Sequence, residues 1–380
     1  MKRIDAYIFH PPSGTSDAER LVDAGRRAGV RDLATGLHEL GLEPVLVASA
    51  CRDAPPTFGD LALERCDSDE ISPFHLGDVL KRLVRERHPD GLLVFGSGSG
   101  VLLSPDRLAQ LQRFASGDTC AALFNNFYSC DFAAIPHPQE LLGIDLPATD
   151  NPLGLTLADA GVPCSALPRN AETQFDIDTP TDLLVLRASG RGGPAIRALV
   201  ESLDVPHPFL PRLLDLLTDR TALVHFLGRV SPRTWADVEP EIACRTGGAI
   251  EGRGMRAGTH THVPFVHQAL TEGGIDQFFR RLARACDGAV IDTRPLLSED
   301  GILPDSADRF ASDLLRPDAV SDPRWRSFTE AALDASIPVL LGGHSIVSGG
   351  LYLLAEACWM GRDLDRRLHP EPFDPDEERS

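Results

Sequence analysis

Lysine is almost missing from this chain: only Lys2 and Lys81 occur among 380 residues. Chemistry that needs a Schiff-base lysine, such as that of pyridoxal phosphate, is therefore not expected. No Gly-Lys-Ser or Gly-Lys-Thr occurs, which excludes a Walker phosphate loop. Long apolar runs are also missing, because no stretch approaches the roughly 18 residues that a membrane span needs. Residues 1–10 are typical of a first β-strand rather than a signal peptide, so we expect a cytoplasmic protein that does not bind membranes.

Metal-binding cysteine motifs are absent as well. The chain has eight cysteines, but no Cys-x-x-Cys occurs and the spacings fit neither a zinc site nor an iron–sulfur cluster. Most of the cysteines stand among apolar residues, as Cys286 and Cys358 do. They are expected to be reduced core residues of a cytosolic protein.

Positive charge is scarce, with 37 Lys and Arg residues against 56 Asp and Glu residues and a net charge of −19. A chain this acidic repels phosphate backbones, so general nucleic-acid binding is not expected. An anionic ligand would need a local group of arginines or backbone N–H groups. The length, with 42% hydrophobic and 24% charged residues, is typical of a globular protein of two domains.

Strand and helix patterns alternate along both halves, which predicts an α/β protein with mostly parallel sheets between layers of helices. We predict a first domain at 1–190, a linker at 190–194, a second and smaller α/β domain at 195–362, and a loose charged tail at 363–380. Strands are expected at 5–10, 43–49, 91–96, 119–127, 221–227, 288–293 and 337–341. Helices are expected at 17–40, 73–88, from 104, at 178–189, from 231, and at 276–286, 322–335 and 351–360.

Polar residues follow three predicted strands of the first half. Ligands of open α/β sheets bind beyond the carboxyl ends of the strands, so these turns are candidate contacts. The first turn could hold an anion on backbone N–H groups, and the glycines of the second allow close approach of a ligand. Plain loops with local hydrogen bonds are the alternative for all three turns, and for the first turn that alternative makes Ser16 the N-cap of the following helix. The residues proposed as substrate contacts are Ser13, Gly14, Ser97, Gly98, Asn125 and Asn126.

The segment Phe175-Asp-Ile-Asp-Thr-Pro-Thr-Asp-Leu183 is the most informative in the chain. Asp176 and Asp178 are one residue apart on an extended segment, so they point the same way and can share a divalent cation. Thr179 and Pro180 then begin a helix. The alternative is that Asp178 or Thr179 only caps that helix.

Asp-Ile-Asp-Thr-Pro-x-Asp-Leu resembles the closing motif of the nucleotidyltransferase-like fold of molybdopterin guanylyltransferase and 2-phospholactate guanylyltransferase. Residues 26–49 and 91–108 resemble other landmarks of that family in the same order, so the resemblance covers about residues 1–188. It implies a three-layer α/β/α sheet of the nucleotide-diphospho-sugar transferase type. It also implies Mg²⁺ on Asp176 and Asp178, and phosphate contacts from Arg26 or Arg27.

The chain departs from the family pattern at two places. The family opens with a glycine-rich loop that carries Arg and Lys, whereas residues 10–16 here contain no lysine. The metal-binding Asp that follows the family's third strand falls at Ser97. A domain that keeps the fold with altered or lost catalysis is therefore a second hypothesis.

The second half carries no such resemblance, but polar residues follow its strands. Arg229, Asp292 with Arg294, and His344 with Ser345 could line one cleft, or could belong to three separate turns. Arg253 stands between glycines, which suits an anion-binding loop. His260 and His262 alternate as strand neighbours and could bind zinc in a hydrolase if carboxylates join them.

The leading hypothesis is a nucleotidyltransferase that moves a nucleotidyl group from a nucleoside triphosphate to a small phosphorylated or acidic acceptor. Asp176, Asp178 and His344 are the predicted catalytic residues, and Asp176 and Asp178 the predicted Mg²⁺ ligands. The alternative is a catalytically degenerate scaffold that binds a ligand or partner, with any chemistry around Asp292, Arg294 and His344.

Overall fold

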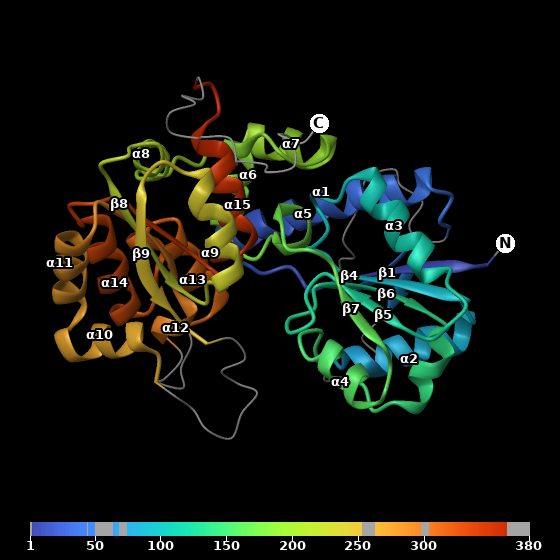
Figure 1. The fold of residues 1–380 in the computed structure, drawn as a ribbon. Helices are drawn as coiled ribbons and strands as arrows, with labels where there is room; N and C mark the ends of the chain where they lie inside the picture. Colours follow the sequence, from blue (N-terminus) through green and yellow to red (C-terminus); the bar gives the residue numbers. More distant parts are fainter. Residues whose placement is uncertain are drawn as a thin grey trace.

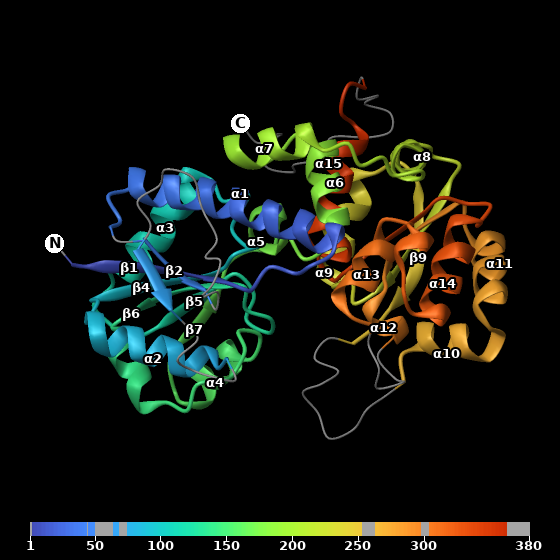
Figure 2. The same ribbon diagram turned by 180° about the vertical axis from the view of Figure 1, so that it is seen from behind.

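The computed structural model describes residues 2–43, 45–49, 64–67, 74–252, 263–297 and 304–362. These residues form two β-sheets that lie in separate lobes, with helices on both faces of each sheet (Figures 1 and 2). The predicted α/β class with mostly parallel sheets is confirmed. Arg253, His260 and His262 and the predicted tail at 363–380 lie outside the described residues.

The larger sheet has seven described strands. Neighbouring strands run parallel except at β6, which pairs antiparallel with β4 and with β5. The sequence patterns predicted neither β3, β6 nor β7. In sheet order the strands are β3 (Glu64–Asp67), β2 (Val45–Ser49), β1 (Ile4–His10), β4 (Gly91–Gly96), β6 (Phe132–Pro136), β5 (Ala122–Phe124) and β7 (Cys164–Ala166).

The two faces of the larger sheet are covered by different helices, because side chains alternate along each strand. Ile8 and Phe95 pack in one apolar cluster with α1 and α3, whereas Tyr7 and Val94 pack in another with α2 and α4. The helical segments of this half are α1 (Asp17–Glu39), α2 (Leu76–Arg87), α3 (Pro105–Ala115), η1 (Pro138–Gly143), α4 (Leu153–Asp159) and α5 (Ala171–Gln174).

The smaller sheet is parallel throughout its four described strands, in the order β11 (Val339–Gly342), β10 (Gly288–Asp292), β8 (Leu223–Gly228) and β9 (Arg245–Ile250). One face packs on α6, α8 and α15 and the other on α10, α11 and α14. The helical segments around it are α6 (Pro180–Ser189), α7 (Pro194–Ser202), α8 (Leu210–Leu217), α9 (Pro232–Val238), η2 (Glu239–Glu241), α10 (Phe265–Gly273), α11 (Ile275–Ala285), α12 (Arg294–Leu297), α13 (Ser306–Asp313), η3 (Pro317–Ala319), α14 (Pro323–Leu333), η4 (Ser345–Val347) and α15 (Gly349–Cys358).

Helices α1 and α6 join the two lobes. The long helix α1 reaches from the larger sheet to α6, α7 and α13 (Figure 2). Gly25 permits this approach, since a Cβ there would lie 2.5 Å from Leu183 Cδ2. Helix α6 packs against β11 and α15, and the hydroxyl of Thr181 donates to the Leu341 carbonyl at 2.7 Å. One apolar cluster therefore runs from α1 through α6 into the smaller sheet.

None of the helices in the described part of the chain is long and apolar enough to cross a membrane. The six cysteines whose side chains the structure describes are all free thiols. Cys130, Cys244, Cys286 and Cys358 are buried, as expected for core residues.

Candidate functional site

The segment Asp176–Asp178 lies between α5 and α6 and pairs with the loop that follows β4. Ser99 and Asp176 form an antiparallel bridge, and the Ile177 N–H donates to the Gly98 carbonyl at 3.0 Å. A Cβ at Gly98 would lie 2.2 Å from Asp176 Oδ1, so only glycine leaves room for this carboxylate. The predicted residues Gly98 and Asp176 are thus brought into direct contact.

Asp176 carries a buried oxygen without a hydrogen-bond partner. Within the described residues, no donor reaches its Oδ1. Burial, followed by the negative charges of Asp178 and Asp131, raises the pKa of Asp176 well above the ordinary value of a carboxyl group. The positive charge of Arg26 acts in the opposite direction, but its Nε donates to the Ile177 carbonyl at 2.8 Å. A buried carboxylate oxygen without a donor is costly while it is charged, and either protonation or a bound cation would relieve that cost.

The smaller sheet holds the same segment from the other side. The Asp176 N–H donates to the hydroxyl of Ser345 at 3.2 Å, from the loop after β11. A Cβ at Gly343 would lie 2.9 Å from Thr179 Cγ2 and 3.7 Å from Asp178 Cβ. The carboxyl ends of β4 and β11, which belong to different sheets, therefore meet at this segment. Both alternatives from the sequence, one in each half, fall on a single site.

Two arginine–aspartate pairs follow the strands of the smaller sheet. Arg229 forms a two-pronged ion pair with the fully buried Asp292, and Arg294 Nη2 lies 3.2 Å from Oδ2 of the fully buried Asp313. Burial alone would raise the pKa of Asp292, but the charge of Arg229 and its hydrogen bonds hold it below the ordinary value. The negative charge of Asp178 also acts on Arg229, so these pairs lie near the two site aspartates.

The turn after β1 forms a separate hydrogen-bonded cluster around Asp23. His10 Nε2 lies 3.0 Å from Asp23 Oδ1, the Ser13 hydroxyl donates to Oδ2 at 2.8 Å, and Arg27 Nε donates to Oδ2 at 2.7 Å. Burial alone would raise the pKa of Asp23, but hydrogen bonds from these three groups, first from His10, lower it. Ser13 and Arg27, both predicted to bind substrate, thus have a partner within the protein.

Glu19 occupies the backbone N–H groups that the sequence analysis assigned to an anion. Its Oε2 accepts from the N–H groups of Thr15 and Ser16 at 3.0 and 2.9 Å and completes a capping box with Ser16. A Cβ at Gly14 would lie 2.3 Å from the Glu19 carboxyl carbon. The start of α1 therefore has an internal carboxylate where the prediction placed a ligand.

Asn125 and Asn126 make local hydrogen bonds. Asn125 Nδ2 donates to Asp131 Oδ2 at 2.7 Å, and its Oδ1 accepts the N–H of Asp131 at 2.9 Å. Asn126 Oδ1 accepts from Tyr128 N–H at 3.3 Å and from Arg169 Nη2 at 3.3 Å. Asn125 thereby holds Asp131, whose charge acts on Asp176, so it serves the site indirectly.

A divalent cation would find two close carboxylates here and few other ligands. No group of three or more His, Cys, Asp or Glu residues with metal-binding geometry occurs in the described ranges. Magnesium is commonly held by one or two carboxylates, with water and substrate phosphates filling the other positions. Asp176 and Asp178, with the orphaned Oδ1 of Asp176, fit that mode. Ser97 also fits an altered site, because its buried hydroxyl has no hydrogen-bond partner among the described residues.

Sequence reasoning did not identify Asp131, Asp150 and Ser99 as neighbours of the site. Asp150 lies close enough to Asp178 for the two charges to interact, and burial with that charge raises the pKa of Asp150. The signal for Asp131 was its place after a predicted strand, next to Asn125. Nothing local marks Asp150, which lies in the turn-rich stretch before α4.

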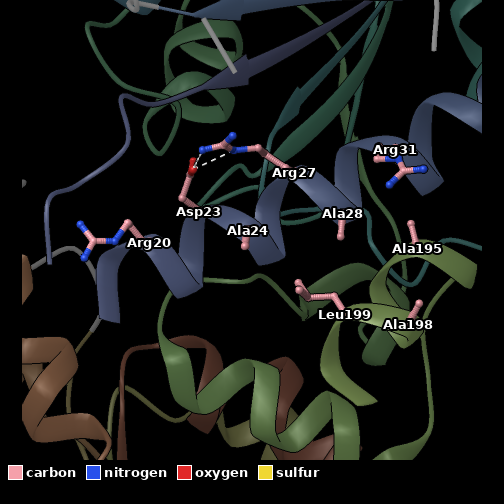
Figure 3. A pocket seen from close by; sticks show the side chains of 9 residues that line it. All are labelled: Arg20, Asp23, Ala24, Arg27, Ala28, Arg31, Ala195, Ala198 and Leu199. Carbon is pink, nitrogen blue, oxygen red and sulfur yellow. Dashed lines mark hydrogen bonds and ion pairs between the residues drawn. The ribbon is translucent and has the colours of Figure 1, made fainter. Parts of the chain in front are cut away.

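A groove lies outside this site, between α1 and α7 (Figure 3). Its volume is about 680 Å³, and alanines of both helices with Leu199 form its floor. Arg20, Arg27 and Arg31 lie along its α1 side, and Figure 3 shows Arg27 turned to its ion pair with Asp23.

No protein-family model and no curated protein matches the chain. Solved structures of low similarity do. A candidate nucleotide-diphospho-sugar transferase from Desulfovibrio desulfuricans is 15% identical, with 53% of this chain and 95% of that chain covered and a TM-score of 0.36. A cytidylyltransferase from Leptospira borgpetersenii is 12% identical, with 53% and 93% covered and a TM-score of 0.38. A CMP:2-keto-3-deoxy-manno-octonic acid synthetase in complex with CTP is 10% identical, with 43% and 89% covered and a TM-score of 0.27. Because every TM-score is below 0.5, we base the function on the side chains described above.

Proposed function

We propose that the protein transfers a nucleotidyl group from a nucleoside triphosphate to a small phosphorylated or acidic acceptor, with Mg²⁺ held by Asp176 and Asp178. The observation that carries this proposal is the buried, unpartnered Oδ1 of Asp176, placed beside a second carboxylate and against Gly98. A protein gains nothing in stability from such an arrangement, so a ligand explains it best. We infer the type of reaction from the resemblance of the Asp176–Leu183 motif to the closing motif of nucleotidyltransferases.

In the proposed reaction, an oxygen of the acceptor attacks the α-phosphorus, the bond between the α-phosphorus and its bridging oxygen breaks, and pyrophosphate leaves. Bound Mg²⁺ would neutralise the negative charge that gathers on the phosphates. The chain's own residues orient the reactants: Asp176 is fixed by Gly98 and Ser345, and Asp178 faces the loop of His344. We propose that His344 accepts the proton of the attacking acceptor oxygen as a general base, because it is partly exposed on that loop and lies near the charge of Asp292.

A second candidate is a ligand-binding scaffold without catalysis. It is favoured by Ser97, which stands where the resembled family has a metal-binding Asp. In that case the same cleft would bind a nucleotide or acidic ligand without turnover. The cytoplasmic location predicted from the sequence stays a prediction.

Thermal unfolding with MgGTP, MgCTP and MgATP, together with pyrophosphate release, tests the proposal. One nucleotide is expected to raise the melting temperature of the wild type but not of Asp178→Asn. Asp106→Asn, a change of an exposed Asp on α3, serves as the matched control and should behave like the wild type. Pyrophosphate release in the presence of an acidic acceptor supports the transferase, and binding without release supports the scaffold. If no nucleotide shifts the melting temperature, the transferase is wrong, and so is a scaffold that binds nucleotides.

A further inference from the structure

Asp292 fixes an arginine at the carboxyl end of β8. Arg229 Nε and Nη2 donate to the two carboxylate oxygens at 2.6 and 3.0 Å, so the guanidinium plane is held by a fork. The Arg294 N–H donates to Asp292 Oδ1 at 3.2 Å, which ties the start of α12 to the same carboxylate. Asp292 is fully buried, whereas 27% of the Arg229 side chain stays exposed.

Asp313 fixes a second arginine in the same way. Arg294 Nη2 lies 3.2 Å from Asp313 Oδ2, and Nη1 donates to the hydroxyl of Thr293 at 2.7 Å. Asp313 is fully buried on α13, and the Arg294 side chain keeps 16% of its surface open. Two arginines on adjacent parallel strands therefore have buried anchors and open outer faces.

Arg294 lies close to Asp178, one of the two proposed metal ligands, and Arg229 lies within range of its charge. A Cβ at Gly343 would lie 3.6 Å from Arg294 Nη2 and 3.7 Å from Asp178 Cβ, so only this glycine separates the two side chains. The charge of Asp178 also acts on Arg229. We therefore expect a molecule that approaches Asp178 from the smaller sheet to come within reach of both guanidinium groups.

Buried ion pairs of this kind are poor stabilisers, because desolvation of both charges offsets most of their attraction. Two of them at the ends of neighbouring strands indicate a role in binding. Each guanidinium has five N–H donors, and only some of them donate to groups of the protein. The remaining donors match the oxygens of a phosphate or carboxylate.

We propose that Arg229 and Arg294 bind the anionic group of the acceptor, a phosphate or a carboxylate, and that Asp292 and Asp313 are the positioning residues that hold these arginines in place. The inference rests on the proposed function for the reaction, but the anion site itself is measurable without a nucleotide. It assigns the acceptor to the smaller sheet and the Mg²⁺–nucleotide to the larger one. The arginines, whose charges are already paired with Asp292 and Asp313, then offer their remaining N–H donors to the anion at one side of the cleft, while the cation balances the aspartates at the other.

The test is isothermal titration of the full chain with inorganic phosphate and, separately, with malonate, at low salt and without Mg²⁺ or nucleotide. Arg294→Gln is expected to weaken binding of the preferred anion at least tenfold, since it removes a charge-assisted pair of hydrogen bonds. Arg229→Lys and Arg294→Lys, which keep the positive charge next to Asp292 and Asp313, are expected to weaken it several-fold because the planar fork of the guanidinium is lost. Arg245→Gln, at the opposite end of the same sheet, should bind like the wild type. Binding of phosphate alone points to a phosphorylated acceptor, and tighter binding of malonate points to a carboxylic acid.

Two results would overturn the proposal: neither anion binds to the wild type, or binding is unchanged in both lysine variants. The lysine variants decide the matter if Arg294→Gln does not fold, as judged by circular dichroism. Thermal unfolding with Mg–nucleotide distinguishes failure of the anion site from failure of the proposed function. Melting shifts by Mg–nucleotide that persist in Arg294→Lys, together with lost phosphate binding, support two adjacent subsites. Loss of phosphate binding in that variant, when no nucleotide shifts any of the proteins, supports the anion site and removes the transferase.

Discussion

Replacing Asp176 by Asn is expected to stabilise the metal-free protein. The side chain keeps its size, so it still fits against Gly98, but it no longer carries a negative charge beside Asp178. Its new NH₂ group can donate to that neighbouring carboxylate. A change at a proposed catalytic position would thus increase the free energy of unfolding, as expected where function and stability conflict.

The size of the effect follows from the charges. For scale, any two carboxylates that are about 5 Å apart repel by about 3 kcal/mol at an effective dielectric constant near 20, and we take this as the order of magnitude for neighbouring aspartates. Burial and the charge of Asp178 raise the pKa of Asp176, and uptake of a proton by Asp176 relieves this repulsion. We therefore expect a gain of about 1–2 kcal/mol, or about 2–8 °C in melting temperature at neutral pH. Because the pKa in the folded state lies above that of the unfolded state, acidification stabilises the wild type at this position, and the difference should vanish near pH 4.

The assay is thermal unfolding with and without MgCl₂, using Asp5→Asn as the matched control. Asp5 is also fully buried, but Arg3 Nε and Arg87 Nε each lie 2.9 Å from its carboxylate. Its replacement leaves the largely buried Arg87 without this carboxylate and should destabilise the protein by about 3 kcal/mol. Mg²⁺ should raise the melting temperature of the wild type and of Asp5→Asn, but not of Asp176→Asn. The reasoning is refuted if Asp176→Asn melts below the wild type without metal, or if it responds to Mg²⁺ as the wild type does.

Three further changes test the surroundings of the site. Gly98→Ala should lower the free energy of unfolding in urea by about 2–3 kcal/mol and remove the Mg²⁺ response, because its Cβ would displace Asp176; an unchanged response would contradict the contact. Burial lowers the pKa of His207 to about 4, below the ordinary 6.5, so the stability of the wild type should fall as the pH drops from 6.5 to 4. The melting temperature of His207→Asn, measured at several pH values, should depend less on pH over that range. Thr181→Val should cost about 1–2 kcal/mol in urea unfolding by leaving the Leu341 carbonyl unpaired; no loss would show that this bond adds little to the contact between α6 and β11.

Local signals predicted the starts of several helices, whereas α4, α5, α7, α8, α10, α12 and α13 were not predicted. Ser104 with Pro105 begins α3, and Thr179 with Pro180 begins α6, as the sequence patterns indicated. These starts depend on hydrogen bonds within one turn, so the residues on the spot determine them. Strand β6 was missed because its five residues follow β5 closely and its partners, β4 and β5, are chosen by packing rather than by local preference.

The site was predictable only in part. The spacing of Asp176 and Asp178 on an extended segment indicated a shared cation, and it depends on the backbone alone. The sequence could not indicate that Gly343 and Ser345 lie beside these aspartates, because nothing local encodes how two lobes are placed. The contacts of Asp23 and Glu19 in the first turn were missed for a similar reason. The sequence offers several hydrogen-bond donors near each carboxylate, and only the conformation of the folded loop determines which donor binds.

The packing of α6 has a consequence for how such a chain can evolve. Helix α6 stands at the end of the first half of the sequence, and its buried residues Leu183–Leu186 belong to an apolar cluster that residues of both halves share. Recombination at the glycine-rich turn after this helix would separate the two halves. The first half would then expose the apolar surface of α6, and the second half would lose the helix that covers its apolar core. Substitutions in one half at this interface therefore require matching substitutions in the other half. We expect the two sheets to be inherited together.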